Sequence, residues 1–297
     1  MGKVDIKKCP VCGSLKFNKV LTANDYLVTG ESFDIMECID CSLRFTSPIP
    51  AESEIGEYYK SDKYISHAKR VTSIFDLVYK IVQKFTLHSK KKTVVQFSQK
   101  QNGTLLDIGC GTGEFLIKIV NHGWDISGVE VNKAARKLAE SNTGSTIMNQ
   151  KEFFKSEQKY DVITLWHSLE HLHELKQYLQ KISLSLNANG VVIIAVPNYN
   201  SYDAEYYQQD WAAYDAPRHL YHFSSNAMIN LMERFKFKLI NNKQMPFDPF
   251  YVSLLSEMSV RKKHNIIKAL WIGCKSYLKG RKDANRGSSV LYIFKTT

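Results

Sequence analysis

Short apolar runs alternate with amphipathic stretches from about residue 104 to residue 244. Continuous runs of Val, Ile and Leu predict buried parallel strands, and the segments between them repeat apolar residues at helical spacing. The predicted strands cover 104–108, 124–129, 145–148, 160–165 and 190–196, and the predicted helices cover 114–121, 132–141, 173–186 and 225–235. This alternation predicts an α/β fold with a doubly wound, mostly parallel sheet.

The C-terminal part departs from this alternation. Phe237–Gln244 and Ser289–Lys295 both have strand character, and residues 245–287 separate them. A separation of this length is unusual for a connection inside one domain, so we expect an insertion with a role of its own.

The segment before the alternation is expected to be helical. A helix is predicted to begin over 52–59, followed by the segment 64–67, and a second helix is predicted over about 71–89. The second helix carries lysines and ends in the run 90–92. This basic helix either caps the core or lines a substrate site.

The first strand of the alternation runs into a glycine-rich turn. Residues 107–113 follow the pattern Asp-x-Gly-x-Gly-x-Gly, and an amphipathic helix comes next. Glycines let the backbone approach a ligand closely, and free N–H groups at a helix start favour a carboxylate or phosphate. The next predicted strand closes on Glu130, where doubly wound folds place an acid on a ribose diol. The spacing differs from the Gly-x-Gly-x-x-Gly of dinucleotide enzymes, and it resembles motif I of class I S-adenosylmethionine-dependent methyltransferases.

That resemblance implies a seven-stranded Rossmann-like sheet whose last two strands form an antiparallel pair at one edge. It also implies S-adenosyl-L-methionine as methyl donor, with Asp107 and the glycines around its methionine end and Glu130 on its ribose hydroxyls. The implied donor-binding residues are Asp107, Gly109, Cys110, Gly111, Gly113, Glu130, Val131, Gln150, Trp166 and His167. The acid that often contacts adenine after the third strand is absent here, because Asn149 and Gln150 stand in its place.

Four of the six cysteines form two Cys-x-x-Cys pairs: Cys9, Cys12, Cys38 and Cys41. In a cytosolic chain this pattern indicates zinc rather than disulfides, and four thiolates make a closed structural site. Both motifs resemble the knuckles of a zinc ribbon, and a redox or vestigial site is the alternative. We therefore expect a zinc ribbon over 1–48, a linker with capping helices over 49–100, and a methyltransferase domain over 101–297 with a helical insertion at about 245–287.

The fourth predicted strand is followed by Trp-His-Ser-Leu-Glu-His over residues 166–171. Ligands bind beyond the carboxyl ends of such strands, so His167, Glu170 and His171 are expected to face the donor. The Glu-His pair resembles that of ubiquinone-biosynthesis O-methyltransferases, some of which bind a divalent cation here through two acids and a histidine. His167 stands where the first acid would be. A neutral histidine can take a proton from an acceptor hydroxyl, and the alternative is that Glu170 and His171 only orient the following helix.

A second polar cluster follows the fifth predicted strand. Residues 211–223 form a loop rich in aromatic side chains, histidine and arginine, and such a loop predicts acceptor recognition. Arg218 is expected to hold an anionic group, and His219 or His222 to act as base; a packed structural loop is the alternative. The predicted catalytic residues are His167, Glu170, His171 and His222, and the predicted acceptor-binding residues are Trp211, Arg218, His219, Tyr221 and Tyr251.

The combination of ribbon and core resembles two groups of enzymes. One contains small-molecule and sugar methyltransferases with a four-cysteine zinc domain, and the other contains ribosomal RNA guanine methyltransferases. The motifs Trp-His-Ser-Leu-Glu-His and Pro-Arg-His-Leu-Tyr-His-Phe favour the first group. No Asn-Pro-Pro-Tyr-like tetrad follows the fourth strand, which argues against methylation of the exocyclic amines of nucleobases. No Pro-Cys pair follows it either, which argues against methylation at C5 of cytosine. We expect O- or C-methylation of a sugar, quinone-like or lipid-linked acceptor; a nucleic-acid methyltransferase and a non-catalytic zinc-dependent binding module are the alternatives.

The composition indicates either an anionic partner or surface, or a soluble protein with a few solvated basic faces. The chain of 297 residues has a formal net charge of +11, and no apolar run reaches membrane-spanning length, so we expect a cytoplasmic protein.

Eight basic residues and no acid lie within 261–282, interleaved with aliphatic and aromatic residues. This pattern predicts either an interfacial helix on an anionic membrane or a lid helix with solvated lysines. Tyr251, Leu254 and Leu255 are expected to line the acceptor pocket in both cases.

Overall fold

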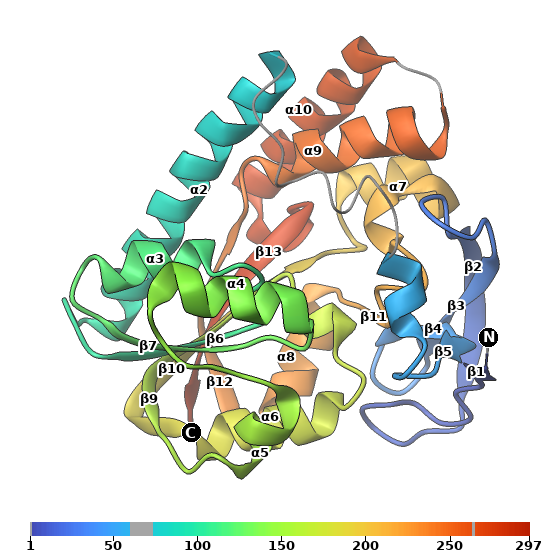
Figure 1. The fold of residues 1–297 in the computed structure, drawn as a ribbon. Coiled ribbons are helices and arrows are strands. Elements are labelled where there is room, and N and C mark those ends of the chain that lie inside the picture. Colours follow the sequence, from blue (N-terminus) through green and yellow to red (C-terminus); the bar gives the residue numbers. More distant parts are fainter. Residues whose placement is uncertain (1, 60–73, 263–264) are drawn as a thin grey trace.

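A seven-stranded sheet forms the centre of the computed structural model, which describes residues 2–59, 74–262 and 265–297 (Figure 1). Its strands are β6 (Thr104–Ile108), β7 (Asp125–Val129), β8 (Ile147–Met148), β9 (Tyr160–Trp166), β10 (Leu186–Pro197), β12 (Phe237–Gln244) and β13 (Ser289–Thr296). They are ordered β12-β13-β10-β9-β6-β7-β8, and only β13 runs against its neighbours. The doubly wound, mostly parallel sheet with an antiparallel edge is therefore confirmed.

Helices cover both faces of this sheet. On one face lie α2 (Ile74–Ser98), α3 (Glu114–Val120) and α4 (Lys133–Thr143), and on the other lie α5 (Gln150–Lys155), α6 (Leu175–Leu184) and α8 (Ser225–Glu233) (Figure 1). Successive strand side chains point to opposite faces. Leu105 accordingly packs with Val94 of α2, whereas Leu106 packs with Phe153 of α5.

Several element boundaries differ from the sequence expectation. Helix α2 continues to Ser98 through the lysine run at 90–92, and the predicted helix over 52–59 is a 3₁₀ turn, Ile55–Tyr59. Helices α5 and α7 (Tyr202–Tyr207) were not expected, nor were the 3₁₀ turns Leu169–His171, Gln208–Asp210 and Ala212–Tyr214. The segment 64–67 and the first residues of the helix predicted over 71–89 lie outside the described residues.

The N-terminal segment forms small antiparallel sheets. Its strands are β1 (Lys3–Val4), β2 (Phe17–Asn24), β3 (Ser32–Cys38), β4 (Arg44–Ser47) and β5 (Ile49–Pro50). Strand β5 pairs with β1, and β4 takes a further partner from the core, β11 (Tyr221–His222). The aromatic loop after β10 therefore completes the sheet of the ribbon.

The insertion between β12 and β13 is a helical hairpin. It consists of α9 (Asp248–Leu255), a π-helical turn (Ser256–Val260), α10 (Ile266–Lys282) and a 3₁₀ turn (Ala284–Arg286). Gly273 of α10 lies so close to α9 that an added Cβ would stand 2.9 Å from the Cα of Phe250. Among the described helices, none is both long and apolar enough to cross a membrane.

Candidate functional site

The glycine-rich turn joins β6 to α3. Gly109 has φ +77°, and a Cβ there would lie 2.5 Å from the Cβ of Ser168. Gly111 has φ +56°, and no atom lies within 4 Å of the position that its Cβ would take. Only glycine adopts such angles without strain, so the turn presents bare backbone to the space above the sheet.

Glu130 stands beside this turn at the carboxyl end of β7. Its carboxylate accepts hydrogen bonds from the backbone N–H of Gly111 at 2.9 Å and of Asn132 at 2.8 Å. Val131 is exposed, and Gln150 opens α5 at the neighbouring strand end, after Asn149 has capped that helix. The structure thus brings these predicted donor residues to one edge of the sheet.

A buried acid and a lysine face each other across this edge. Asp107 accepts a 2.6 Å hydrogen bond from the Thr164 hydroxyl, and burial raises its pKa to about 7. The Lys90 ammonium of α2 lies 4.7 Å from the ring centroid of Trp166, and burial lowers its pKa. The Trp166 indole N–H finds no hydrogen-bond acceptor in the described part of the chain.

The sequence did not single out Lys90, because its helix was expected to end one residue earlier. Cys110 also differs from expectation, since its thiol points into the core: a Cβ added at Gly128 would lie 2.8 Å from it. Burial raises the pKa of the Cys110 thiol. Cys110 can therefore serve a donor only through its backbone.

These groups fit a ligand that carries both a carboxylate and a ribose. The Lys90 ammonium and the Trp166 N–H can meet a carboxylate, the open backbone at Gly111 allows close approach, and the oxygens of Glu130 can accept from a diol.

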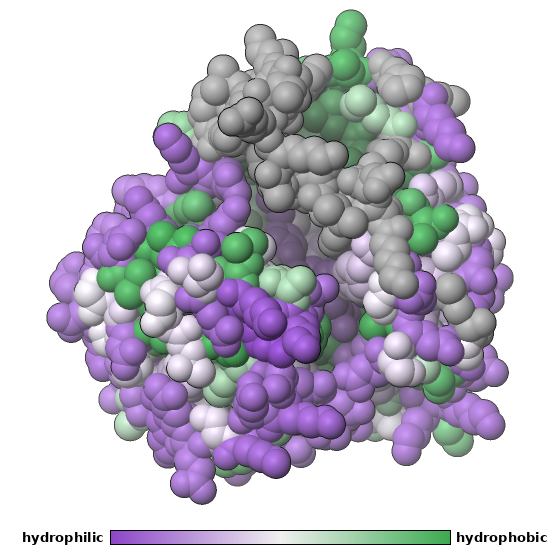
Figure 2. Space-filling model, viewed as in Figure 1, coloured by the Kyte–Doolittle hydropathy of each residue, from purple (hydrophilic) through white to green (hydrophobic). Residues whose placement is uncertain are grey.

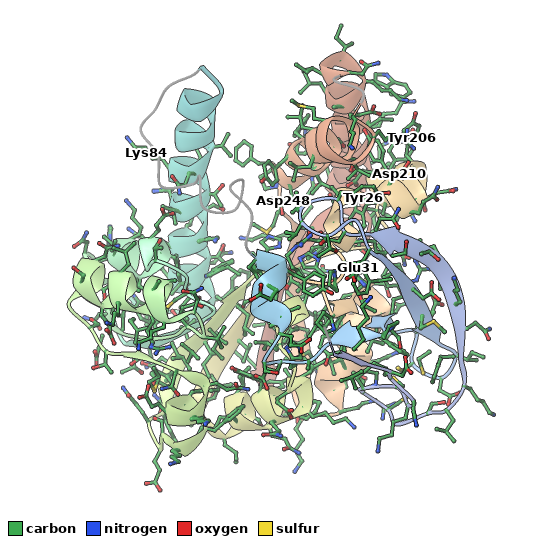
Figure 3. All side chains as sticks on the ribbon, turned by 45° about the vertical axis from the view of Figure 1, so that its right-hand side comes forward. Tyr26, Glu31, Lys84, Tyr206, Asp210 and Asp248 are labelled. Carbon is green, nitrogen blue, oxygen red and sulfur yellow. The ribbon has the colours of Figure 1, made fainter. Side chains whose placement is uncertain are left out.

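A cavity of about 710 Å³ adjoins this edge. His167, directly after Trp166, forms part of its wall, and Tyr26 of the ribbon and Asp248 of α9 also line it (Figure 3). Its other walls include Ala23 and Leu27 of the ribbon, Trp211, Tyr214 and His219 of the aromatic loop, and Tyr251, Val252 and Leu255 of α9. Both its volume and its aromatic lining are typical of a small-molecule site.

His167 is held between two carboxylates. Its Nε2 lies 3.2 Å from Oδ2 of Asp248, and its Nδ1 lies 3.6 Å from Oε1 of Glu170. Burial alone would lower the pKa of His167, but the hydrogen bonds and charges of the two acids outweigh it and raise the pKa to about 9. A pKa of about 9 favours the protonated form of His167 at neutral pH, which does not favour the role of base that the sequence predicted for it.

We expect the imidazole of His167 to titrate near pH 9 in NMR spectra. Because the folded pKa lies above the ordinary value of 6.5, the ion pair with Asp248 contributes fully below pH 6.5 and is lost as the pH passes about 9. Asp248→Asn should move the midpoint down towards 6.5, whereas Asp283→Asn at the end of α10 should not. A wild-type midpoint at or below 6.5 would contradict this assignment.

His171 and His219 form a second histidine pair. Nδ1 of His171 donates to the carbonyl oxygen of Arg218 at 2.9 Å, and Nδ1 of His219 donates to that of Ala213 at 2.8 Å. A carbonyl oxygen only accepts, so both rings carry a proton on Nδ1, and in the neutral form of either ring the lone pair is on Nε2. Burial lowers the pKa of His171 to about 4, with the charge of His219 adding to the effect. Only His219 of this pair lines the cavity.

The buried carboxylate of Glu170 completes this cluster. Burial would raise its pKa, but the nearby His167 ring and the neighbouring histidines lower it, and neither carboxylate oxygen has a hydrogen-bond donor among the described residues. Glu170, His171 and His219 each offer one donor atom within 4.8 Å of the others. The cluster nevertheless fits the divalent cation of some relatives poorly, because the charge of His167 already faces the only acid.

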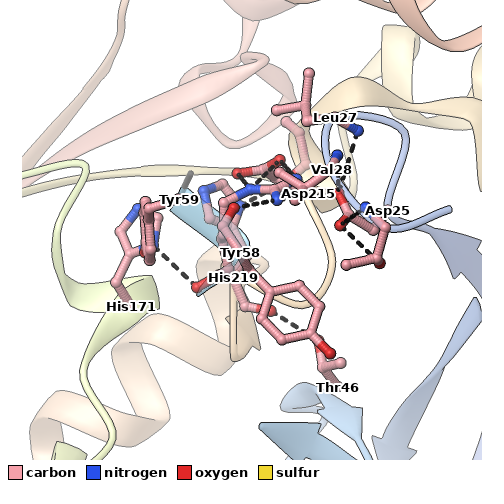
Figure 4. Close-up of polar contacts among 12 residues, drawn as sticks. Asp25, Leu27, Val28, Thr46, Tyr58, Tyr59, His171, Asp215 and His219 are labelled. Carbon is pink, nitrogen blue, oxygen red and sulfur yellow. Dashed lines mark hydrogen bonds and ion pairs between the residues drawn. The ribbon is translucent and has the colours of Figure 1, made fainter. Parts of the chain in front are cut away.

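Arg218 differs most from its prediction as an anion clamp. It is 1% exposed, and its guanidinium donates to Asp215, to Asp25 of the ribbon and to the carbonyl oxygen of Tyr58, three residues that are labelled in Figure 4. Asp25 also accepts from the backbone N–H groups of the β2–β3 turn. Arg218 belongs to the cavity wall, but its charge already faces the carboxylates of Asp25 and Asp215, so it joins the ribbon to the core.

Two further predictions are not supported. Nε2 of His222 lies 3.1 Å from Oγ1 of Thr46, and the hydroxyl of Tyr221 donates to the carbonyl oxygen of His173. Both residues lie in β11 against the ribbon, and neither lines the cavity. Trp211 and Tyr251 do line it, as expected.

The four ribbon cysteines meet at one point. Their thiols lie within 4.8 Å of one another, with 3.5 Å between Cys9 and Cys41 and 3.4 Å between Cys12 and Cys38, and all four are free. Four thiols at this separation suit the shell of a tetrahedral metal ion.

The sheet order, the reversed β13 and the turn beside Glu130 define a class I S-adenosylmethionine-dependent methyltransferase. The sequence model described as "Methyltransferase domain" matches residues 82–242, more than half of the chain, and the protein belongs to this family. S-adenosyl-L-methionine is the methyl donor of this class.

Individual relatives are more distant. Ubiquinone biosynthesis O-methyltransferase of Pelagibacter ubique is 24% identical over 184 residues, which cover 54% of this chain and 74% of that protein. The protein of the same name from Hydrogenovibrio crunogenus is 23% identical over 119 residues, which cover 37% of this chain and 49% of that protein. The structure of magnesium protoporphyrin IX methyltransferase from Synechocystis shares the fold with a TM-score of 0.55 at 11% identity, covering 83% of this chain and all of that one.

Proposed function

We propose that this enzyme methylates an oxygen or carbon atom of a small molecule bound in the cavity of about 710 Å³. The proposal rests on the observation that the predicted donor site and the cavity adjoin each other. Trp166 belongs to the donor edge, and the next residue, His167, lines the cavity. An acceptor there would meet the donor at the carboxyl end of β9, where ligands of this fold class bind. The relatives named as ubiquinone biosynthesis O-methyltransferases support a small hydroxylated acceptor.

When bound, S-adenosyl-L-methionine supplies an electrophilic methyl group. Nε2 of His219 takes the proton of the acceptor, since it has a lone pair and belongs to the cavity wall. The Glu170 carboxylate stabilises the resulting imidazolium. His167 stays protonated and holds α9 through Asp248, so that the hairpin closes the cavity against water.

We further propose that Cys9, Cys12, Cys38 and Cys41 hold one structural zinc ion. Their free thiols and short separations support it. The metal would fix the ribbon over 1–48, and the ribbon in turn supplies one wall of the cavity.

Transfer from radiolabelled donor to fractions of a cell extract tests this function. Label is expected in the small-molecule fraction. Label in the RNA fraction, or in no fraction while the protein binds the donor, would overturn the assignment of the acceptor.

Glu130→Ala is expected to weaken donor binding by roughly 1.5–3 kcal/mol, or about 10- to 150-fold, because it removes a charged acceptor. Titration calorimetry with S-adenosyl-L-methionine measures the change. Glu140→Ala on the exposed side of α4 is the matched control and should bind like wild type. Equal affinity of Glu130→Ala and wild type would show that Glu130 does not hold the ribose.

A further inference from the structure

Helix α10 has two different apolar faces. Ala269, Ile272 and Gly273 are buried where α10 packs on α9 and α7. A second stripe at helical spacing is exposed: Ile267, Leu270, Trp271 and Leu278, with exposed fractions of 83%, 46%, 52% and 49%. A lid helix accounts for the first face only, since nothing in the described chain covers the second.

The charges of α10 are all basic. Lys268 faces the buried Glu257, but Lys275, Lys279, Arg281 and Lys282 form no ion pair with any described residue. The ammonium of Lys275 lies 3.6 Å from the ring centroid of Trp271, directly at the border of the apolar stripe. Exposed apolar side chains edged by unneutralised cations are the pattern of an interfacial helix.

We propose that this stripe of α10 docks on the surface of an anionic lipid bilayer. Trp271, Ile267 and Leu270 would enter the boundary of the acyl chains, while Lys275 and Lys279 face the headgroups. A second copy of the chain is a poor partner, because it would bring the same cations against themselves. A nucleic acid would satisfy the cations but would leave the aliphatic stripe in water.

The position of the hairpin agrees with this orientation. Helices α9 and α10 project from one end of the molecule (Figure 1), and hydrophobic residues gather over them in the space-filling view (Figure 2). The same hairpin lines the cavity through Tyr251, Val252 and Leu255. Docking would therefore bring the cavity to the bilayer and favour an amphiphilic acceptor, a consequence that rests on the proposed function.

Co-sedimentation of the full chain with vesicles tests the docking. Vesicles of phosphatidylcholine mixed with phosphatidylglycerol should pellet the protein at low salt, and pure phosphatidylcholine or high salt should release it. Lys275→Glu with Lys279→Glu should lower the partition constant more than about tenfold, because each lost cation removes about fivefold. Ile267→Ser with Trp271→Ser should lower it as well.

Matched controls carry the same changes elsewhere. One control variant combines Lys137→Glu on α4 with Lys155→Glu on α5. The other is Leu184→Ser on α6, where the Leu184 side chain is 73% exposed. Both should bind vesicles like wild type. Unchanged melting temperatures show that each variant is folded. These assays need no methyl transfer, so their failure leaves the proposed function standing.

Three results would overturn the proposal. The first is no pelleting with anionic vesicles at low salt, and the second is pelleting that the stripe variants do not reduce. The third is a wild-type dimer in light scattering that Ile267→Ser with Trp271→Ser turns into a monomer, which would make a second copy the occupant.

Discussion

His219→Gln is expected to slow methyl transfer by about 10²- to 10⁴-fold while donor affinity stays unchanged, because general-base catalysis typically contributes that much. The residue lines the cavity, its Nδ1 proton is held by the carbonyl oxygen of Ala213, and its Nε2 lone pair remains for the acceptor. Single-turnover kinetics with labelled donor measure the effect, and calorimetry measures donor binding.

A purely structural role of His219 has a different signature. The His219→Ala variant leaves space for added imidazole, which should restore part of the rate only if the lost group is a base. His222→Gln is the comparison, since that side chain contacts Thr46 and lies outside the cavity wall. The His222→Gln variant should have a lower melting temperature than wild type, with only a small effect on the rate of the chemical step. A fully active His219→Gln would leave proximity and water exclusion as the source of catalysis.

Removal of the metal from the four-cysteine cluster is expected to reduce methyl transfer by about 10²-fold or more, because small displacements of positioning residues have effects of that size. The ribbon is built into the wall of the cavity that we propose as the acceptor site: Thr46 donates to the carbonyl oxygen of His219, Asp25 pairs with Arg218, and Tyr26 and Leu27 line the cavity. Donor affinity should change little, since the predicted donor residues come from α2, the start of α5 and the central sheet with its adjoining turns, and none comes from the ribbon.

Chelation followed by zinc analysis, donor calorimetry and a transfer assay tests this coupling. Cys41→Ser should reproduce the loss, and Cys274→Ser, an exposed cysteine of α10, is the matched control. A metal-free protein that retains full turnover would contradict the coupling. Loss of donor binding together with turnover would mean that the whole fold, not only the acceptor site, depends on the ribbon.

The sequence predicted the central sheet well because its signals are local. Continuous apolar runs give β6, β9 and β10 within a few residues of their ends, and Phe237–Gln244 is a strand over its predicted length. Strand β11 was missed, because two residues in a loop carry no periodicity and become a strand only when β4 lies beside them.

The candidate site likewise has features that the sequence predicted and features that it did not. The glycine-rich turn and the two cysteine pairs were found from the sequence, since strand, turn and helix, or two cysteines three positions apart, are encoded in contiguous residues. The roles of the histidines could not be found from the sequence in this way. His167 became a cation because Asp248, 81 positions later, lies 3.2 Å from its ring.

Arg218 shows why only the tertiary structure decided the acceptor site. Its sequence neighbours suggest a free cation in a recognition loop, yet Asp25, 193 positions earlier, lies 3.0 Å from its guanidinium. The chain alone determined the fold class, the donor turn and the cysteine cluster, because each depends on short-range pattern. Which side chains are buried, paired, protonated or open to the cavity depends on contacts between distant segments, and these contacts set both the pKa of a group and its availability.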